Sequence, residues 1–395
     1  MRLRHLVSLL AACSLTATGV SAAPAAAPAG KPDIIVGQVV DLTGSDGHSG
    51  NEYVVGAKAY FDEVNANGGV FGRQIKQVVI DSKGSAPKAF QATQQLIDTD
   101  KADVLFGYTG TAAVSLVVRS KLLQKNNIAL VAPLTGADAL RATASDVAMP
   151  DSEGFVPQLF HLRASYSQEA RKLVKQAINL GMKKIAVFYA DDAFGKGGLK
   201  AVEAELAKRN MTLVAKSAYD PRKLDVSEPV LMLSRAQPQA VIMVSETQAT
   251  ANFVKQFRGK MTGTQLMGLS VVNPKVLIRE AGIENVQGIG LTVVVPNPYN
   301  PVTIIAREHK EMVTPYQNQA ELSYNTMEGY LAAKLLVEGL NRAGAQMNRE
   351  KIQRALESMG SVSLGGYEIN YSPTDHRGSS YVDMAVINKD GKLLN

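Results

Sequence analysis

Hydroxyl and glycine residues gather where an expected strand meets an expected helix. Thr109, Gly110 and Thr111 follow the apolar run "VLF" and precede the apolar-periodic run "AAVSLVVRSKLL". The first N–H groups of a helix have no partner inside the helix, and hydroxyls beside them add donors for an anion. The same residues could simply cap the helix. The sequence therefore predicts either a helix cap or a binding site for an anionic group at this position.

Further polar residues follow other expected strands of a parallel sheet. Open α/β sheets bind ligands at the carboxyl ends of their strands, so these positions predict a ligand site. For each residue alone, helix capping or loop solvation explains the polarity equally well. The sequence predicts two α/β lobes, and the common placement of these residues at one edge of both lobes favours a ligand site in a cleft between them. The positions are Asp41–Ser49, Leu134–Ala137, Ser165, Tyr166, Asp191–Phe194, Ser245–Thr247 and Ser270.

The sequence offers no motif for catalysis, a metal or a bound cofactor. It lacks a G-x-S-x-G nucleophile motif and the glycine-rich phosphate-binding motifs, and we interpret Asp191-Asp192 as a loop or helix-entry pair. None of the histidines has metal-ligand spacing to another histidine or to a cysteine. We therefore expect a protein that is not an enzyme and needs no cofactor or metal. The histidines are His5, His48, His161, His309 and His376.

Composition indicates an ordinary folded protein with about two domains, at roughly 150 residues per domain. Hydrophobic residues make up 46% and charged residues 20% of the 395 residues. The net charge is +6, but the basic residues are scattered and form no run interleaved with aromatics. We therefore expect no nucleic-acid partner.

The N-terminus predicts export from the cytoplasm. A basic start, "MRLRH", precedes the apolar run "LVSLLAACSLTATGV" and small residues, which is typical of a secretory signal peptide over residues 1–22. Residues 23–32 predict a flexible leader. Cys13 in "LAAC" leaves lipid anchoring open as an alternative to ordinary cleavage, and it is the single Cys. No later run is long and apolar enough for a membrane span. We expect a soluble periplasmic protein without disulfides.

From Asp33 onward, short apolar runs alternate with helical patterns, which indicates parallel α/β architecture. The pattern predicts two Rossmann-like lobes in tandem, followed by a mostly helical segment and two strand-like pieces, "GGYEINYS" and "SYVDMAVINKDG", that complete the lobes. With the crossovers that the resemblance described next implies, the expected boundaries are 33–162 plus 297–377 for the first lobe and 163–296 plus 378–395 for the second.

Three longer stretches resemble the type I periplasmic solute-binding proteins of ABC importers, the leucine/isoleucine/valine-binding family. They are "GAKAYFDEVNANGGVFGRQIKQVVIDSKGSAPKAFQATQQLI", "FGYTGTAAV…NNIALVAPLTGA" and "LRASYSQEARKLV…GMKKIAVFYADDAFGKGGL". The resemblance covers residues 33–395. It implies lobes joined by three crossovers, near residues 161–164, 295–297 and 376–378, which close around a small solute. It also implies a membrane permease as partner, and we expect a monomer.

The resemblance carries over to individual positions. Thr111 matches a hydroxyl that holds the ligand carboxylate, and Phe194 and Glu246 fall where relatives place tyrosines. The acidic residue that pairs with the ligand ammonium in relatives aligns with the uncharged Ser270. Burying an ammonium without a partner in a closed cleft costs several kcal/mol. If the ligand is an amino acid, another carboxylate must therefore pair with its ammonium. Glu246 is the first candidate and Asp192 the second. The expected ligand-binding residues are Thr109, Gly110, Thr111, Leu134, Thr135, Gly136, Tyr166, Phe194, Glu246 and Ser270, with Tyr53 also packing on the solute.

These observations lead to one main hypothesis and two alternatives. We expect an extracytoplasmic receptor that captures a small amino acid or related carboxylate and delivers it to the permease of an ABC importer. The uncharged Ser270 leaves open an uncharged or purely anionic solute, including an aromatic acid that stacks on Tyr166 or Phe194. A ligand-sensing module of a signalling system is one alternative. An exported two-lobe enzyme, such as a nucleotide-sugar transferase, is the other, although its phosphate site or carboxylate pair is missing.

Overall fold

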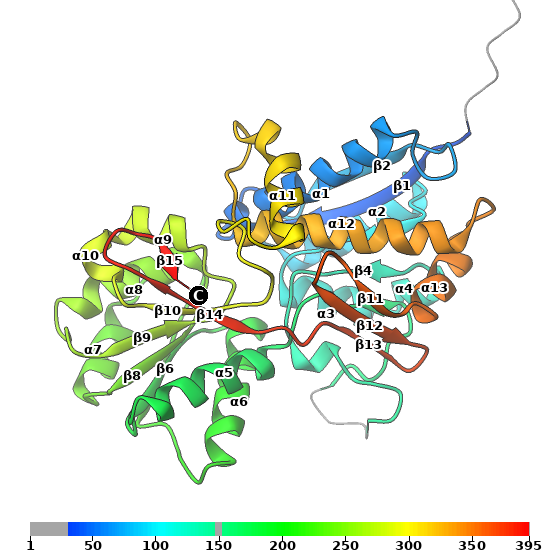
Figure 1. Ribbon diagram of the computed structural model, residues 1–395. Helices are drawn as coiled ribbons and strands as arrows, with labels where there is room; N and C mark the ends of the chain where they lie inside the picture. Colours follow the sequence, from blue (N-terminus) through cyan, green and yellow to red (C-terminus); the bar gives the residue numbers. More distant parts are fainter. Residues whose placement is uncertain (1–30, 147–151, 395) are drawn as a thin grey trace, which may run out of the picture. The chain divides into compact units, whose positions relative to one another are not determined.

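The computed structural model describes residues 31–146 and 152–394. The predicted signal peptide, Cys13 and most of the predicted leader lie outside the described residues. Within the described residues, no helix combines the length and the apolar character needed to cross a membrane. The strands of these residues form a five-stranded, a seven-stranded and a three-stranded sheet. We call the elements around the five-stranded sheet the first lobe and those around the seven-stranded sheet the second lobe (Figure 1).

The first lobe is built on a parallel sheet with the order β2-β1-β3-β4-β5. Its inner strands are apolar and buried, as expected for a sheet covered by helices on both faces. The strands are β1 (Ile34–Val40), β2 (Ile75–Asp81), β3 (Val104–Phe106), β4 (Leu130–Val131) and β5 (Leu159–Phe160). The helices between them are α1 (Gly47–Ala66), α2 (Ala86–Asp98), α3 (Thr111–Arg119), α4 (Leu122–Lys125) and the short 3-10 helix η1 (Asp138–Leu140).

The second lobe contains the parallel strands β6 to β10, extended by two antiparallel strands from the end of the chain. The sheet order is β15-β14-β10-β9-β8-β6-β7. The strands are β6 (Ile185–Ala190), β7 (Ala215–Tyr219), β8 (Ala240–Val244), β9 (Gln265–Gly268), β10 (Gly290–Val293), β14 (Asp383–Ile387) and β15 (Leu393–Leu394). The helices are α5 (Tyr166–Asn179), α6 (Ala193–Ala207), α7 (Ser227–Arg235), α8 (Thr247–Arg258), α9 (Pro274–Ala281) and α10 (Ile283–Val286).

After β10 the chain returns to the first lobe. There it forms α11 (Ile304–Val313), the 3-10 helix η2 (Thr314–Tyr316), α12 (Tyr324–Ala343) and α13 (Arg349–Glu357). Both α11 and α12 contact α1, and Figure 1 shows α12 running alongside the first sheet. Glycines let the backbones of α1 and α12 touch. A Cβ on Gly56 would lie 2.0 Å from the Thr326 carbonyl oxygen, and one on Gly329 would lie 2.1 Å from that of Tyr53.

The last strands differ in part from the sequence-based expectation. The second strand-like piece does join a lobe sheet, as β14. The first piece instead contains β12 (Glu368–Ser372), which forms a separate antiparallel sheet with β11 (Gly360–Ser363) and β13 (Asp375–Gly378), two strands outside the predicted pieces. This sheet contacts the first lobe through β13 and β5, where the His161 N–H donates to the His376 carbonyl at 2.9 Å.

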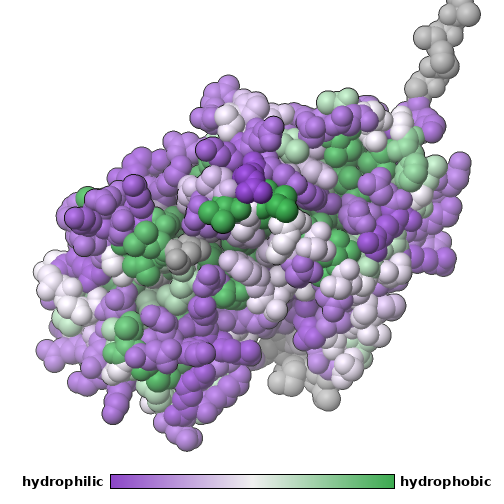
Figure 2. Space-filling model, viewed as in Figure 1, coloured by the Kyte–Doolittle hydropathy of each residue, from purple (hydrophilic) through white to green (hydrophobic). Residues whose placement is uncertain are grey.

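Within the described residues the chain crosses three times between the second lobe and the part formed by the first lobe and the three-stranded sheet: after β5, after β10 and after β13. The parallel α/β class and the three crossovers are thus as predicted. The residue boundaries of the lobes stay a prediction. Outward-facing helix residues are largely charged or polar, and hydrophilic residues cover most of the face seen in Figure 2.

Candidate functional site

A cavity of about 450 Å³ lies between the two lobes. It is lined by loops that follow the carboxyl ends of strands in both sheets, the location at which α/β sheets bind ligands. Of the predicted site residues, the following line it: Thr109, Gly110, Thr111, Leu134, Tyr166, Phe194 and Glu246.

The first-lobe wall of the cavity is formed at the start of α3. Gly110 precedes the helix with φ 88°, a conformation that suits glycine, and no side chain caps the helix. Thr111 and the two alanines that follow it line the cavity. Thr109 instead supports the loop after β1, because its hydroxyl accepts the Asp41 N–H at 2.7 Å. The uncapped N–H groups of α3 are therefore available to an anion.

Two predicted residues lie behind this wall and do not line the cavity. The Thr135 hydroxyl lies 2.7 Å from that of Thr111 and is fully buried. The Gly136 carbonyl accepts the Tyr166 N–H at 2.7 Å. Both residues therefore position Thr111 and Tyr166. The prediction for Tyr53 is wrong: it is fully buried in the first-lobe core, where its hydroxyl donates to the Ala132 carbonyl at 2.8 Å.

Aromatic rings form an apolar part of the wall. Tyr166 begins α5 behind a capping box made by Ser165 and Gln168. Phe194 lies in the first turn of α6, and its ring meets that of Tyr166 edge to face with centroids 5.3 Å apart. These rings offer contact to the apolar part of a solute.

Four carboxylates also line the cavity, and two of them hold backbone in place. Asp41 accepts the Gly44 N–H at 2.6 Å, and Asp192 caps α6 by accepting the Gly195 N–H at 2.9 Å. The other two are Asp46 of the first lobe and Glu246 of the second.

Asp46 and Glu246 have hydroxyl partners and no ion-pair partner among the residues that the structure describes. Ser49 donates to Asp46 at 2.6 Å, and Ser45 donates across the cleft to Glu246 at 3.1 Å. Burial raises the pKa of Glu246 to about 7; the hydrogen bond from Ser45 opposes this, and nearby Asp192 and Asp41 add to it. Burial and the charge of Glu246 also raise the pKa of Asp46. Two carboxylates without an ion-pair partner in one cavity favour a solute that carries a positive charge.

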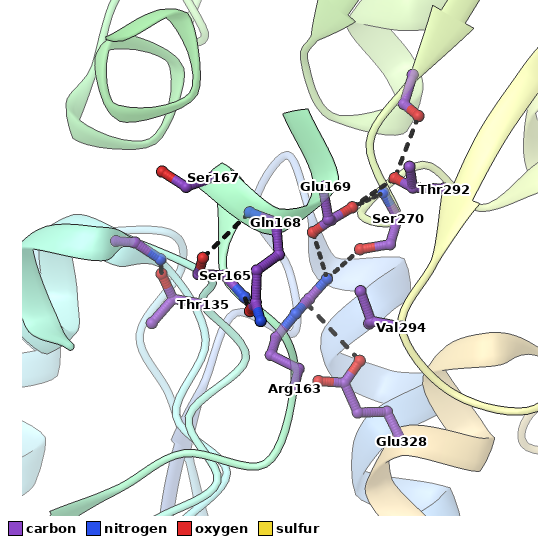
Figure 3. Close-up of polar contacts among 12 residues, drawn as sticks. Thr135, Arg163, Ser165, Ser167, Gln168, Glu169, Ser270, Thr292, Val294 and Glu328 are labelled. Atoms are coloured by element: carbon purple, nitrogen blue, oxygen red, sulfur yellow. Dashed lines mark hydrogen bonds and ion pairs between the residues drawn. The ribbon is translucent and has the colours of Figure 1, made fainter. Parts of the chain in front are cut away.

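Ser270 does not line the cavity and belongs to a buried charge cluster, drawn in Figure 3. Its N–H donates to Glu169 at 2.8 Å, and its hydroxyl accepts a hydrogen bond from Arg163. Arg163 also pairs with Glu169 of α5 at 3.6 Å and with Glu328 of α12 at 3.7 Å. The Thr292 hydroxyl donates to Glu169 as well, and we call Arg163, Glu169, Ser270, Thr292 and Glu328 the hinge cluster. Within this cluster, both the N–H and the hydroxyl of Ser270 are hydrogen-bonded to other residues of the protein.

Sequence reasoning missed several residues that line the cavity, among them Lys83, Arg163, Arg222 and Asn325. Arg163 carried a signal, since it is a charged residue within the apolar stretch "QLFHLRA". Asn325, in "ELSYNTMEGY", carried none. Across residues 31–146 and 152–394, no three His, Cys, Asp or Glu residues come together in a way that could hold a metal ion.

The comparisons with known proteins agree with this architecture. The family model described as "Periplasmic binding protein" matches residues 33–392. The chain therefore belongs to the periplasmic binding protein family, which is a family of solute-binding proteins. It is 25% identical to Leu/Ile/Val-binding protein homolog 3 of Brucella melitensis biotype 1, over 93% of this chain and 95% of that protein. Leu/Ile/Val-binding protein homolog 7 of Brucella suis biovar 1 is also 25% identical, over 99% and 96%.

A solved structure supports the same assignment. The substrate-binding periplasmic protein from Ralstonia solanacearum superposes with a TM-score of 0.84 at 31% identity, over 92% of this chain and 99% of that chain. The resemblance read from the sequence to type I periplasmic binding proteins is thereby confirmed.

Proposed function

We propose that this chain is the extracytoplasmic receptor of an ABC importer. It captures a small amino acid or related carboxylate between its lobes and delivers it, as a monomer, to the membrane permease. The names of its curated relatives, which refer to leucine, isoleucine and valine binding, support an amino acid as the solute. Residues 1–22 direct export to the periplasm.

The observation that carries this proposal is the distribution of charge around the cavity. Uncapped N–H groups and the Thr111 hydroxyl lie on the first-lobe wall, where a carboxylate fits. Glu246 of the second lobe and Asp46 provide negative charge and have hydroxyl partners rather than ion pairs among the described residues, although Lys83, Arg163 and Arg222 also line the cavity. A solute that carries both a carboxylate and an ammonium matches both features.

The ammonium partner is Glu246 rather than residue 270. Ser270 has no charge, and its hydroxyl already accepts from Arg163, so this position offers an ammonium nothing. Micromolar binding requires only about 8 kcal/mol, which a few charge-assisted hydrogen bonds and aromatic contacts supply.

A thermal-shift panel tests the proposal, because a solute that binds only the folded state raises the melting temperature. Matched probes separate the two charged groups: leucine, 4-methylpentanoate without the amine, and 3-methylbutylamine without the carboxylate. Benzoate represents the aromatic acids, and phenylalanine and glutamate widen the panel. We expect a clear shift with amino acids and a smaller one with either half-molecule. No shift with any amino acid or carboxylate would overturn the proposal.

The Thr111→Ala variant tests the anion site. If the hydroxyl meets a charged group, its loss should weaken binding by about 1–3 kcal/mol, measured by isothermal titration calorimetry with the best probe. Thr314→Ala is the control, since that exposed hydroxyl donates to the Lys310 carbonyl and does not line the cavity. Unchanged affinity in Thr111→Ala would remove Thr111 from the site.

A further inference from the structure

Glu52 on α1 is a buried carboxylate whose hydrogen-bond partners come from both lobes. It is 6% exposed. From its own lobe it accepts the Ser323 hydroxyl at 2.8 Å and the Asn325 side-chain amide at 2.9 Å. From the second lobe it accepts the Asn273 side-chain amide, at 2.8 Å to each carboxylate oxygen. The structure records no cation paired with Glu52 among the described residues.

The orientation of Asn273 is fixed by the helix it begins. Its side-chain oxygen accepts the N–H groups of Lys275 and Val276, at 3.0 and 3.2 Å, and so caps α9. Its own N–H donates to the Thr247 hydroxyl at 2.9 Å. Because the oxygen is used by the cap, the NH₂ group must point at Glu52. The donor is therefore held in place by the second lobe, before any contact with the first.

Asn325 connects this contact to the cavity, since it lines the cavity and donates to the same carboxylate. Separating the lobes removes Asn273 from Glu52 while Ser323 and Asn325 remain, both at the start of α12. Water then replaces one donor on the carboxylate. The contact between Asn273 and Glu52 thus exists only when the lobes are together. It shares the Glu52 carboxylate with Asn325, a residue of the cavity wall.

We propose that Glu52 and Asn273 form a latch that holds the two lobes together and positions the cavity wall through Asn325, without touching the solute. This rests on the proposed function, that a solute binds between the lobes. Glu52 and Asn273 are thus positioning residues that set the affinity for every solute of the cavity by the same factor.

The Asn273→Asp variant tests the latch. Aspartate caps a helix as well as asparagine does and has nearly the same size, so α9 is preserved. It replaces the NH₂ group that faces Glu52 with a carboxylate oxygen, and the two like charges repel. We expect the solute-free protein to open, measured as a larger radius of gyration by small-angle X-ray scattering, and the affinity for the best probe to fall about tenfold or more.

Two further variants make the result specific. Glu52→Gln combined with Asn273→Asp reverses the polarity of the contact, so that the new glutamine donates to the new aspartate, and it should restore the radius of gyration and most of the affinity. Asn348→Asp is the matched control: this residue is the exposed N-cap of α13, where its side chain accepts the Lys351 N–H at 2.9 Å. The same substitution there should change neither measurement.

The latch is overturned if Asn273→Asp keeps the wild-type radius of gyration and affinity, or if the double variant remains as open as Asn273→Asp. The scattering measurement needs no solute, so it tests the latch even if the thermal-shift panel finds no ligand. A positive panel with an inert Asn273→Asp would instead leave the proposed function intact and reject the latch alone.

Discussion

The hinge cluster and a second set of contacts hold the lobes together by different chemistry. This second set, which we call the mouth, consists of Asn273 with Glu52, Ser45 with Glu246, and Lys275 with Glu321. At the hinge, the buried Arg163 guanidinium pairs with one carboxylate from each lobe, and the three side chains are at most 5% exposed. At the mouth, neutral donors meet single carboxylates: Asn273 donates to the buried Glu52, and the exposed Ser45 donates to Glu246. Water can replace a neutral donor at little cost, whereas exposing or orphaning a buried charge is expensive. Opening should therefore break the mouth and preserve the hinge.

The largest expected effect is at the hinge. Replacing Arg163 with Met leaves Glu169 and Glu328 buried without their cation, which typically costs about 3–5 kcal/mol. We expect the free energy of unfolding, measured by urea titration, to fall by that amount. Arg377→Met is the control, because its pair with Asp375 is largely exposed and should contribute less than about 1 kcal/mol. An equal loss of unfolding free energy in the two variants would show that the buried pairs of Arg163 contribute no more than an exposed pair.

A smaller effect, and one that depends on pH, is expected at the mouth. The pKa of Glu246 is about 7 in the fold and 4.5 for an ordinary glutamate, so the folded state holds this proton more tightly. Its contribution to stability is therefore fully present below about pH 4.5 and is lost as the pH rises through 7. With about 1.4 kcal/mol per pKa unit, and some access of water, we expect a loss of about 2 kcal/mol between pH 5 and 8 in the solute-free protein.

The Glu246→Gln variant isolates this contribution. The difference in unfolding free energy between wild type and variant should change over that pH range, and a constant difference would contradict the assignment. Binding of an amino acid should show the opposite trend. Affinity should rise with pH as Glu246 becomes charged, and it should lose this dependence in the variant, measured by calorimetry at several pH values.

The smallest effect is expected at the exposed edge of the mouth. Lys275 and Glu321 join the lobes at 2.8 Å, but their side chains are 42% and 73% exposed. Lys275 also lies over the Tyr299 ring, 5.1 Å from its centroid. Lys275→Met should therefore cost about 1 kcal/mol or less in urea titration and leave the radius of gyration unchanged. Opening as large as that expected for Asn273→Asp would mean that exposed charges, not the buried latch, close the lobes.

Most of the fold could be predicted because its strands and helices carry strong local patterns. The inner strands of the two main sheets, such as β3, β6 and β8, are apolar, and covering helices such as α2, α5 and α8 have a regular apolar face. The missed strands lack such patterns. β5 contains only Leu159–Phe160, and β13 reads Asp-His-Arg-Gly. β13 is held by tertiary contacts instead, such as the stacking of His376 on Phe160 with centroids 4.1 Å apart.

The candidate site could be predicted to the level of loops but not always of side chains. The rule that ligands bind at the carboxyl ends of strands finds Thr111, Phe194 and Glu246, which do line the cavity. It cannot separate a residue on the wall from one behind it, such as Thr135. The hinge cluster and the latch were out of reach because their members come from distant parts of the sequence. Glu52 and Asn273 become neighbours only through the packing of the two lobes.

The glycine contact between α1 and α12 links these two regions. Gly56 and Gly329 let the two backbones touch, and a side chain at either position would clash with the facing carbonyl and force the helices apart. One of them carries Glu52, and the other carries both Asn325 of the cavity wall and Glu328 of the hinge. The packed pair α1 and α12 thus connects the hinge cluster, through Glu328, with the latch, through Glu52.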